Sequence, residues 1–202
     1  MPLVVRAEIV DIRTDTPKVS DVFLVDTNAW YWLFYSRASV SCSTAQANYP
    51  GYLKTALSAK SRLHCYGLTF AELAHNIEKA EREIYANLAN KPISTKQYRY
   101  DCQSQRRKVV TLISDTWADV LTASTMLELD MHNEFMRSAL TLFPSVGLDG
   151  YDLFMAEAAL KAGVTQIVTD DGDYATVPGL TIFTANLRVI QAAQVAGKLV
   201  TR

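Results

Sequence analysis

The sequence predicts an α/β fold with a central parallel sheet, on two observations. Short apolar runs without strict polar alternation, "VFLVD" at 22–26 and "QIVT" at 166–169, are typical of strands buried on both faces. A helical pattern or a tight turn follows these runs, which is the alternation of an α/β domain. Further strands are expected at 63–69 ("LHCYGLT") and at 181–183 ("TIF"), the latter after the turn at Pro178.

Apolar periodicity predicts the helices that cover this sheet. They are expected at 28–36, 70–89, 95–136 with one or more breaks, 150–162 and 185–196. Pro92 and a position near Asp115 are the expected breaks in the long central stretch. We interpret residues of about 90–136 as an inserted helical arm on the sheet domain.

The length of 202 residues suits one domain with a full hydrophobic core. We expect a single domain over 21–202, preceded by an N-terminal extension over 1–20. Within the extension, residues 3–13 alternate enough to form an extra edge strand, and a linker follows them.

Composition favours a globular protein in the cytoplasm, without a membrane association. Apolar residues make up 49% and charged residues 20%, and the formal net charge is −1. No apolar stretch reaches the roughly 18 to 20 residues that span a bilayer. The start "MPLVVRAEIVDIRTDT" carries charges where a signal peptide needs an apolar run. Cys42, Cys65 and Cys102 lack the spacing of a zinc site and are expected to be free thiols.

The basic stretch "KQYRYDCQSQRRK" at 96–108 is the strongest local concentration of positive charge. Such a stretch with interleaved tyrosines could bind RNA phosphates and stack bases. A solvated helix face is the alternative explanation. The candidate RNA contacts are Lys96, Arg99, Arg106, Arg107 and Lys108.

Acidic residues stand where strands end or helices begin, and the first two also have local explanations. Asp26 closes "FLVD" and could cap the next helix, although Thr27 or Asn28 could cap it equally well. Glu72 matches a Thr69-x-x-Glu72 capping box, in which the glutamate bonds back to the threonine N–H. Capping and a functional role stay open for both acids.

Two further acidic features lie in the C-terminal half. Asp149 is the expected N-cap of the helix at 150–162, which leaves Asp152 in its first turn, where the helix dipole favours a carboxylate. The run "TDDGDY" follows a predicted strand, and Gly172 permits a tight turn there. Its acids are Asp170, Asp171 and Asp173.

The shared placement of these acids is harder to explain by capping and turns. In a parallel sheet the strand ends meet at one edge, where open α/β sheets bind ligands. Two carboxylates about 4 Å apart repel by roughly 4 kcal/mol at an effective dielectric near 20, so a cluster must take up protons or bind cations. Mg²⁺ or Mn²⁺ suits such oxygen ligands and can activate water against a phosphoryl group. The predicted chemistry is phosphodiester hydrolysis.

The same stretches resemble a known family. "VFLVDTNAW", "LTFAEL", "YDLFMAEAALKAG" and "IVTDDGDYATVPGLTIFTAN" have the order and form of the PIN domain, as found in VapC-type toxins of bacterial toxin–antitoxin pairs. The resemblance covers most of 22–190. Its most specific part is the T-x-D-x-D-[FY] form at 169–174, preceded by D-x-x-x-A-x-A at 152–158.

The resemblance implies a PIN-like three-layer α/β/α sandwich and a Mg²⁺/Mn²⁺-dependent ribonuclease, often a homodimer, whose toxin members are neutralised by an antitoxin protein. The implied catalytic and metal-binding acids are Asp26, Glu72, Asp152 and Asp171, with Asp173 as a fifth metal ligand and Asn28 and Thr169 as polar supports. Asp171 is preferred because the family places its acid two positions after the threonine. Asp170 is expected to point outward.

Other functions compete with a toxin ribonuclease. The extension and the long insertion depart from the compact toxin pattern, so a stand-alone PIN protein, or a PIN-like module that binds RNA or protein without cleavage, is the alternative. A haloacid dehalogenase phosphatase would need an aspartate where Asn28 stands. A dinucleotide-binding domain would need G-x-G-x-x-G, which the sequence lacks.

Overall fold

The computed structural model describes residues 3–38, 46–128 and 130–202. Within these residues, seven parallel strands form one sheet in the order β4-β3-β2-β5-β6-β1-β7. The strands are β1 (Glu8–Asp11), β2 (Val22–Val25), β3 (Arg62–Tyr66), β4 (Thr125–Leu127), β5 (Gln166–Val168), β6 (Thr181–Thr184) and β7 (Leu199–Val200). The predicted α/β fold with a central parallel sheet is confirmed.

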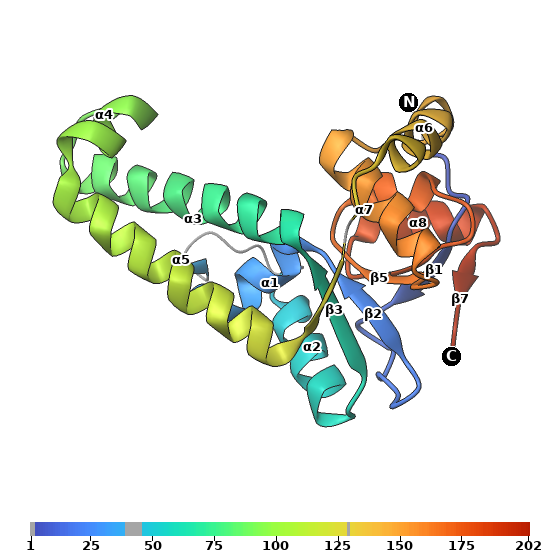
Figure 1. Ribbon diagram of the computed structural model, residues 1–202. Helices are drawn as coiled ribbons and strands as arrows, with labels where there is room; N and C mark the ends of the chain where they lie inside the picture. The colour runs from blue at the N-terminus through green and yellow to red at the C-terminus, as the bar shows by residue number, and fades with distance from the viewer. Residues whose placement is uncertain (1–2, 39–45, 129) are drawn as a thin grey trace.

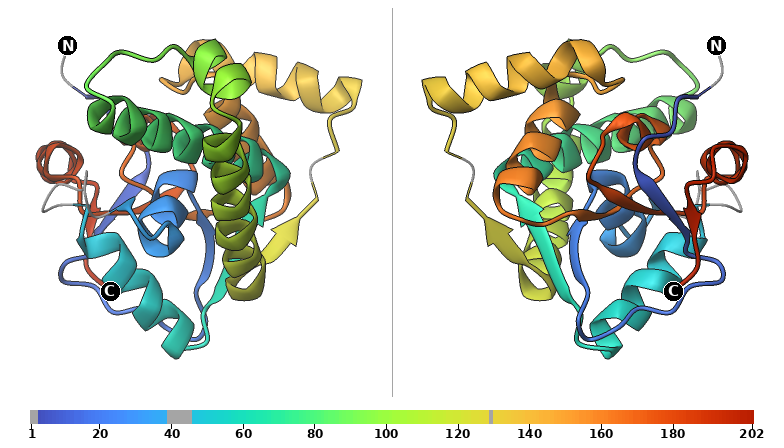
Figure 2. Two further views of the ribbon diagram at one scale, coloured as in Figure 1. Left: turned by 90° about the vertical axis from the view of Figure 1, so that its left-hand side faces the viewer. Right: turned by 90° about the vertical axis from the view of Figure 1, so that its right-hand side faces the viewer.

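Helices cover both faces of the sheet (Figure 1). They are α1 (Thr27–Phe34), α2 (Asn48–Ser58), α3 (Gly67–Leu88), α4 (Thr95–Asp101), α5 (Gln103–Ala123), α6 (Asn133–Leu142), α7 (Gly150–Lys161) and α8 (Leu187–Val195), with 3₁₀ turns η2 at Phe143–Ser145 and η3 at Gly172–Thr176. Successive residues of a strand face opposite layers. Accordingly, Leu24 packs in a core with α6, α7 and α8, while Phe23 and Val25 pack in a core with α1 and α2. Figure 2 shows helices on both sides of the sheet from two further directions. This is the expected three-layer sandwich.

The N-terminal strand lies inside the sheet and not at its edge. β1 pairs with β6 through Ile9 and Ile182, and with β7 through Ile9 and Leu199. The prediction of an edge strand missed this because β7, only two residues long, gives little apolar pattern to detect. Helix α2 and strand β4 were also not predicted.

The inserted arm is a helical hairpin that projects away from the sheet. α3 and α5 lie side by side, and α4 closes the far end, with Pro92 in the connection between α3 and α4 (Figure 1). The predicted break near Asp115 is wrong, since α5 runs unbroken from Gln103 to Ala123. The Thr116 hydroxyl donates to the carbonyl of Leu112 at 2.7 Å, one turn back, so this buried polar side chain is satisfied within the helix.

The last part of the predicted insertion, from β4 onward, does not belong to the arm. β4 rejoins the sheet beside β3, and α6 packs on α7. Cys65 and Cys102 are free thiols, whereas Cys42 lies outside the described residues. In the described ranges, every helix is too short or too polar to cross a bilayer.

Candidate active site

Asp26 directly follows β2 and is the first acid of the candidate site along the chain. It is 2% exposed and occupies the N-cap position of α1, yet its side chain makes no capping hydrogen bond. Instead, its Oδ2 accepts a 2.7 Å hydrogen bond from Thr169 Oγ1, just beyond β5. Of the two explanations that the sequence left open for this acid, capping is therefore wrong. The carboxylate is held by a neighbouring strand end.

Thr169 also fixes the acidic turn that follows β5. Its Oγ1 accepts the main-chain N–H of Asp171 at 2.9 Å, and Asp171 Oδ1 accepts the N–H of Asp173 at 2.8 Å. Asp171 thus caps the 3₁₀ turn with one carboxylate oxygen. The fully buried Thr169 joins the Asp26 side chain to the main chain of Asp171.

Asp152 lies in the first turn of α7, as expected. Asp149 Oδ1 caps this helix by accepting the N–H groups of Tyr151 at 3.0 Å and Asp152 at 3.2 Å. The Asp152 side chain is left free of capping, and its Oδ1 accepts a 2.9 Å hydrogen bond from the hydroxyl of Tyr174. Tyr174 is buried beneath the acidic turn.

Glu72 is not part of a capping box. α3 begins at Gly67, so Glu72 lies in its second turn, and the N–H of Tyr66 is accepted by Thr69 Oγ1 at 3.3 Å. The predicted box placed the N-cap at Thr69, whereas the N-cap is Tyr66, three residues earlier. Glu72 is half-buried and faces a pocket shared with Asp149 and Asp152.

Electrostatics links the four predicted acids. Burial, and then the charge of Glu72, raises the pKa of Asp26 to about 8. Asp152 and Asp171 add to that rise, and the hydrogen bond from Thr169 opposes it. Burial likewise raises the pKa of Asp152 to about 7, with the charges of Asp171 and Glu72 among the further causes. Burial and the neighbouring carboxylates therefore disfavour the ionised forms of Asp26 and Asp152.

The donor chemistry of these acids fits a hard divalent cation. Carboxylate oxygens are the ligands that Mg²⁺ and Mn²⁺ prefer, and a cation would favour the ionised form of acids whose pKa is raised. Among the described residues, however, no three His, Cys, Asp or Glu side chains converge as a formed metal site requires. The acids would have to turn further toward one another to share an ion.

The other predicted members of the site differ in their surroundings. Asp170 does not point outward, since its Oδ1 accepts a 2.8 Å hydrogen bond from the hydroxyl of Tyr49 in α2, and burial raises its pKa. Asp173 is exposed, and burial followed by the charge of Asp171 raises its pKa. Asn28 lines a separate pocket between α1 and α3, together with Asn76.

A pocket of about 630 Å³ adjoins the acids, and we call it the flanking pocket. Its walls come from α3, the far part of the arm and the start of α7. The lining residues include Glu72, His75, Arg99, Arg106, Tyr151 and Asp152. The pocket therefore places two acids of the candidate site next to two arginines of the predicted basic stretch.

Much of the basic stretch is engaged within the arm. Glu78 of α3 accepts Nε and Nη2 of Arg99, the latter at 3.0 Å, and lies 3.3 Å from Nη1 of Arg106. These pairs tie α4 and α5 onto α3. Arg99 is exposed and Arg106 is half-buried, so both arginines are in contact with solvent as well as paired with Glu78. The pairing was not predicted because Glu78 lies 21 residues before Arg99.

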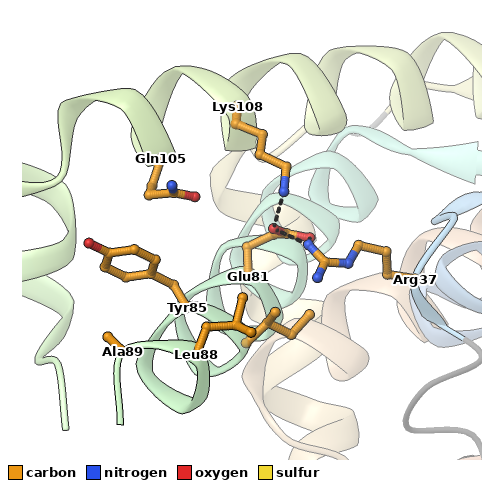
Figure 3. A pocket seen from close by; sticks show the side chains of 8 residues that line it. Arg37, Glu81, Tyr85, Leu88, Ala89, Gln105 and Lys108 are labelled. Atoms are coloured by element: carbon orange, nitrogen blue, oxygen red, sulfur yellow. Dashed lines mark hydrogen bonds and ion pairs between the residues drawn. The ribbon is translucent and has the colours of Figure 1, made fainter. Parts of the chain in front are cut away.

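Glu81 is the second acidic centre of the arm. Figure 3 shows Lys108 and Arg37 reaching this nearly buried carboxylate from different elements, at 3.4 Å and 2.7 Å. The hydroxyl of Tyr35 also donates to Glu81 at 2.6 Å. The remaining predicted RNA contacts, Lys96 and Arg107, are exposed on α4 and α5.

The sequence did not predict the residues that hold the acids in place, because these residues lie far from the acids along the chain. The bond from the Tyr174 hydroxyl to Asp152 was not predicted. Tyr49 and Asn186 anchor Asp170, the latter by donating from Nδ2 to its carbonyl at 2.7 Å. An aromatic residue that follows the "DDGD" run was the available signal for Tyr174, whereas nothing local points to Tyr49.

Comparison with known proteins gives a family match over most of the chain. A model of the PIN domain matches residues 23–180. No curated protein matches. Similar solved structures include VapBC2 from Rickettsia felis bound to a DNA fragment from their promoter, with 12% identity, a TM-score of 0.48 and coverage of 80% of this chain and 96% of that chain. PAE2754 from Pyrobaculum aerophilum is 22% identical, with a TM-score of 0.43 and coverage of 87% and 98%.

Proposed function

The chain belongs to the PIN domain family, and from that premise we propose that it is a metal-dependent endoribonuclease. The proposed active site consists of Asp26, Glu72, Asp152 and Asp171, with Asp173 at its exposed margin. One observation carries the proposal: the buried Asp26 carboxylate is not used for capping and is joined through Thr169 to the main chain of Asp171. An N-cap or a simple turn does not require this link.

The proposed cofactor is Mg²⁺ or Mn²⁺, held by the four acids. When bound, such an ion activates water and neutralises charge on a phosphoryl group. The protein's part is to position the ligands. Thr169 orients Asp26, Tyr174 orients Asp152, and burial keeps water from weakening these interactions.

A second candidate function is a module that binds RNA or protein without cleavage. One observation favours it: in the described part of the chain, no three acids lie close enough together to form a metal site. Titration with Mn²⁺ separates the two functions, because a binding module does not require the ion.

We also propose that the protein acts as the toxin of a type II toxin–antitoxin pair, as a homodimer with an antitoxin partner. The motif resemblance to VapC-type toxins supports this role. Co-expression tests it: induction of the chain alone should arrest growth, and a short neighbouring reading frame should relieve the arrest. Growth unaffected by the chain alone would argue for a stand-alone PIN protein.

The experiment for the enzymatic proposal is a cleavage assay with purified protein. Single-stranded RNA and DNA of one sequence are incubated with Mg²⁺, with Mn²⁺ and with EDTA. We expect internal cleavage of the RNA with either ion and none with EDTA. Cleavage that persists in EDTA would contradict metal dependence, and cleavage of DNA alone would contradict the substrate class.

A further inference from the structure

We propose that the flanking pocket is the binding subsite for a nucleotide next to the scissile phosphodiester bond of the RNA. This inference rests on the proposed function. It adds that the inserted arm, and not only the sheet edge, binds substrate, and that a residue beside an active-site acid stacks on a base.

The position and size of the pocket fit a nucleotide. Glu72 and Asp152 line it, so the pocket adjoins the proposed active site. Its volume of about 630 Å³ falls within the range of pockets that hold small organic molecules. A nucleotide seated there would be continuous with a phosphodiester at the acids.

Two arginines supply the phosphate-binding wall. Glu78 accepts Nε and Nη2 of Arg99 and pairs with Nη1 of Arg106, which fixes both side chains. Within the described residues, Nη1 of Arg99 and Nε and Nη2 of Arg106 have no protein partner. Two guanidinium groups against Glu78 leave this wall with a net positive charge, whereas Glu72, Asp149 and Asp152 also line the pocket. Fixed, partly exposed arginine donors are suited to phosphate.

Tyr151 supplies the base-binding wall. It directly precedes Asp152, lines the pocket and is 62% exposed. Stacking on an exposed aromatic ring is how proteins bind single-stranded bases without sequence preference. The ring of His75 in α3 lines the same pocket. The phosphate and base walls thus come from different elements and meet beside the acids.

The test is RNA binding by the full chain in EDTA, so that cleavage does not contribute. Fluorescence anisotropy with a labelled, short, single-stranded RNA of mixed sequence measures Kd over a salt series. Tyr151→Ala should weaken binding about tenfold, whereas Tyr151→Phe, which keeps the ring, should bind as the wild type does. Arg106→Gln should weaken binding and reduce the slope of log Kd against log salt by about 0.7.

Controls are an exposed aromatic residue and an exposed basic residue away from the pocket. Phe143→Ala in η2, where Phe143 is 48% exposed, and Lys54→Ala on α2 should leave Kd unchanged. One outcome is that the wild type binds and cleaves RNA and that Tyr151→Ala and Arg106→Gln bind RNA with the wild-type Kd. The subsite is then wrong, and the enzyme proposal stands. Equal weakening by the controls would also overturn the subsite. A wild type that neither binds nor cleaves RNA overturns both proposals.

Discussion

Thr169 donates its hydroxyl to Asp26 Oδ2 at 2.7 Å. Thr169 Oγ1 in turn accepts the main-chain N–H of Asp171 at 2.9 Å. One buried hydroxyl therefore couples the carboxyl ends of two adjacent strands, β2 and β5, and sets how the two acids lie. Predictions about the site follow from this link.

Thr169→Val should reduce RNA cleavage while the protein remains folded. Valine keeps the buried shape but removes the donor to Asp26 and the acceptor for Asp171. We expect cleavage to fall by about 10- to 100-fold, as for other residues that orient metal ligands. The free energy of unfolding should fall by about 1–3 kcal/mol, because a buried carboxylate and an N–H group lose their partner. Single-turnover cleavage and urea unfolding measure the two effects.

Thr116→Val is the matched control, since Thr116 is also buried but bonds only one turn back within the arm. Its cleavage rate should stay within about twofold of the wild type. Equal cleavage by Thr169→Val and the wild type would contradict the role assigned to the hydroxyl.

Tyr174→Phe should weaken the positioning of Asp152. The variant loses the hydroxyl that donates to Asp152 Oδ1 at 2.9 Å. We expect about tenfold slower cleavage and a loss of about 1 kcal/mol in unfolding free energy. Tyr66→Phe is the control, because the Tyr66 hydroxyl is buried without a partner among the described residues, and its removal should cost little. A comparable loss of cleavage in both variants would argue against a specific role for Tyr174.

Glu78 should make the stability of the arm depend on pH. The hydrogen bond from Arg99 is the largest cause that lowers its pKa. A carboxyl group whose pKa is lowered by folding stabilises the protein above its unfolded value, and this contribution disappears as pH falls through the folded value. Glu78→Gln should therefore lower the free energy of unfolding by about 1–2 kcal/mol at pH 7. This loss lies between those expected for breaking an exposed and a buried ion pair. The difference from the wild type should shrink below about pH 4.

Urea unfolding at pH 7 and at about pH 3.5 measures this difference, with Glu83→Gln as the control on the same helix. Glu83 is exposed and contacts Arg82 only at 4.0 Å, so its replacement should have little effect at either pH. A difference between Glu78→Gln and the wild type that is as large in acid as at neutral pH would contradict the ion-pair explanation.

Mn²⁺ should stabilise the wild type. A ligand that binds only the folded state at 100 times its Kd adds about 2.7 kcal/mol, which a thermal melt detects. Asp152→Asn should remove most of this stabilisation because it removes one charge from the proposed ligand set. An identical rise in Tm for the wild type and for Asp152→Asn would show that the ion binds elsewhere.

Local sequence features predicted the positions of Asp26 and Asp171 just after strands and of Asp152 in a first helical turn, but not the residues that bond to them. Asp26 and Asp171 follow apolar runs whose strand character is local, and parallel strands bring their ends together. Asp170 was misplaced because its partner, Tyr49, belongs to a helix that the apolar pattern did not reveal. The sequence distance between such partners leaves no local pattern from which to infer them.

The same limit applies to the arm. Its helices follow from periodicity, and the basic stretch is plain in the sequence. The pairing of Arg99 with Glu78 depends on how the hairpin closes, as does the pocket shared with Asp152. Charge alone therefore predicted RNA contact without showing that Glu78 fixes the arginines.

The central claim is tested most directly by Asp26→Asn in a single-turnover RNA cleavage assay with Mn²⁺. Asparagine keeps the size and an oxygen that can accept from Thr169 but removes the charge. We predict that cleavage is lost while the fold is retained, and that Asp119→Asn, at an exposed position of α5, cleaves like the wild type. Cleavage by Asp26→Asn at the wild-type rate would contradict the proposed active site.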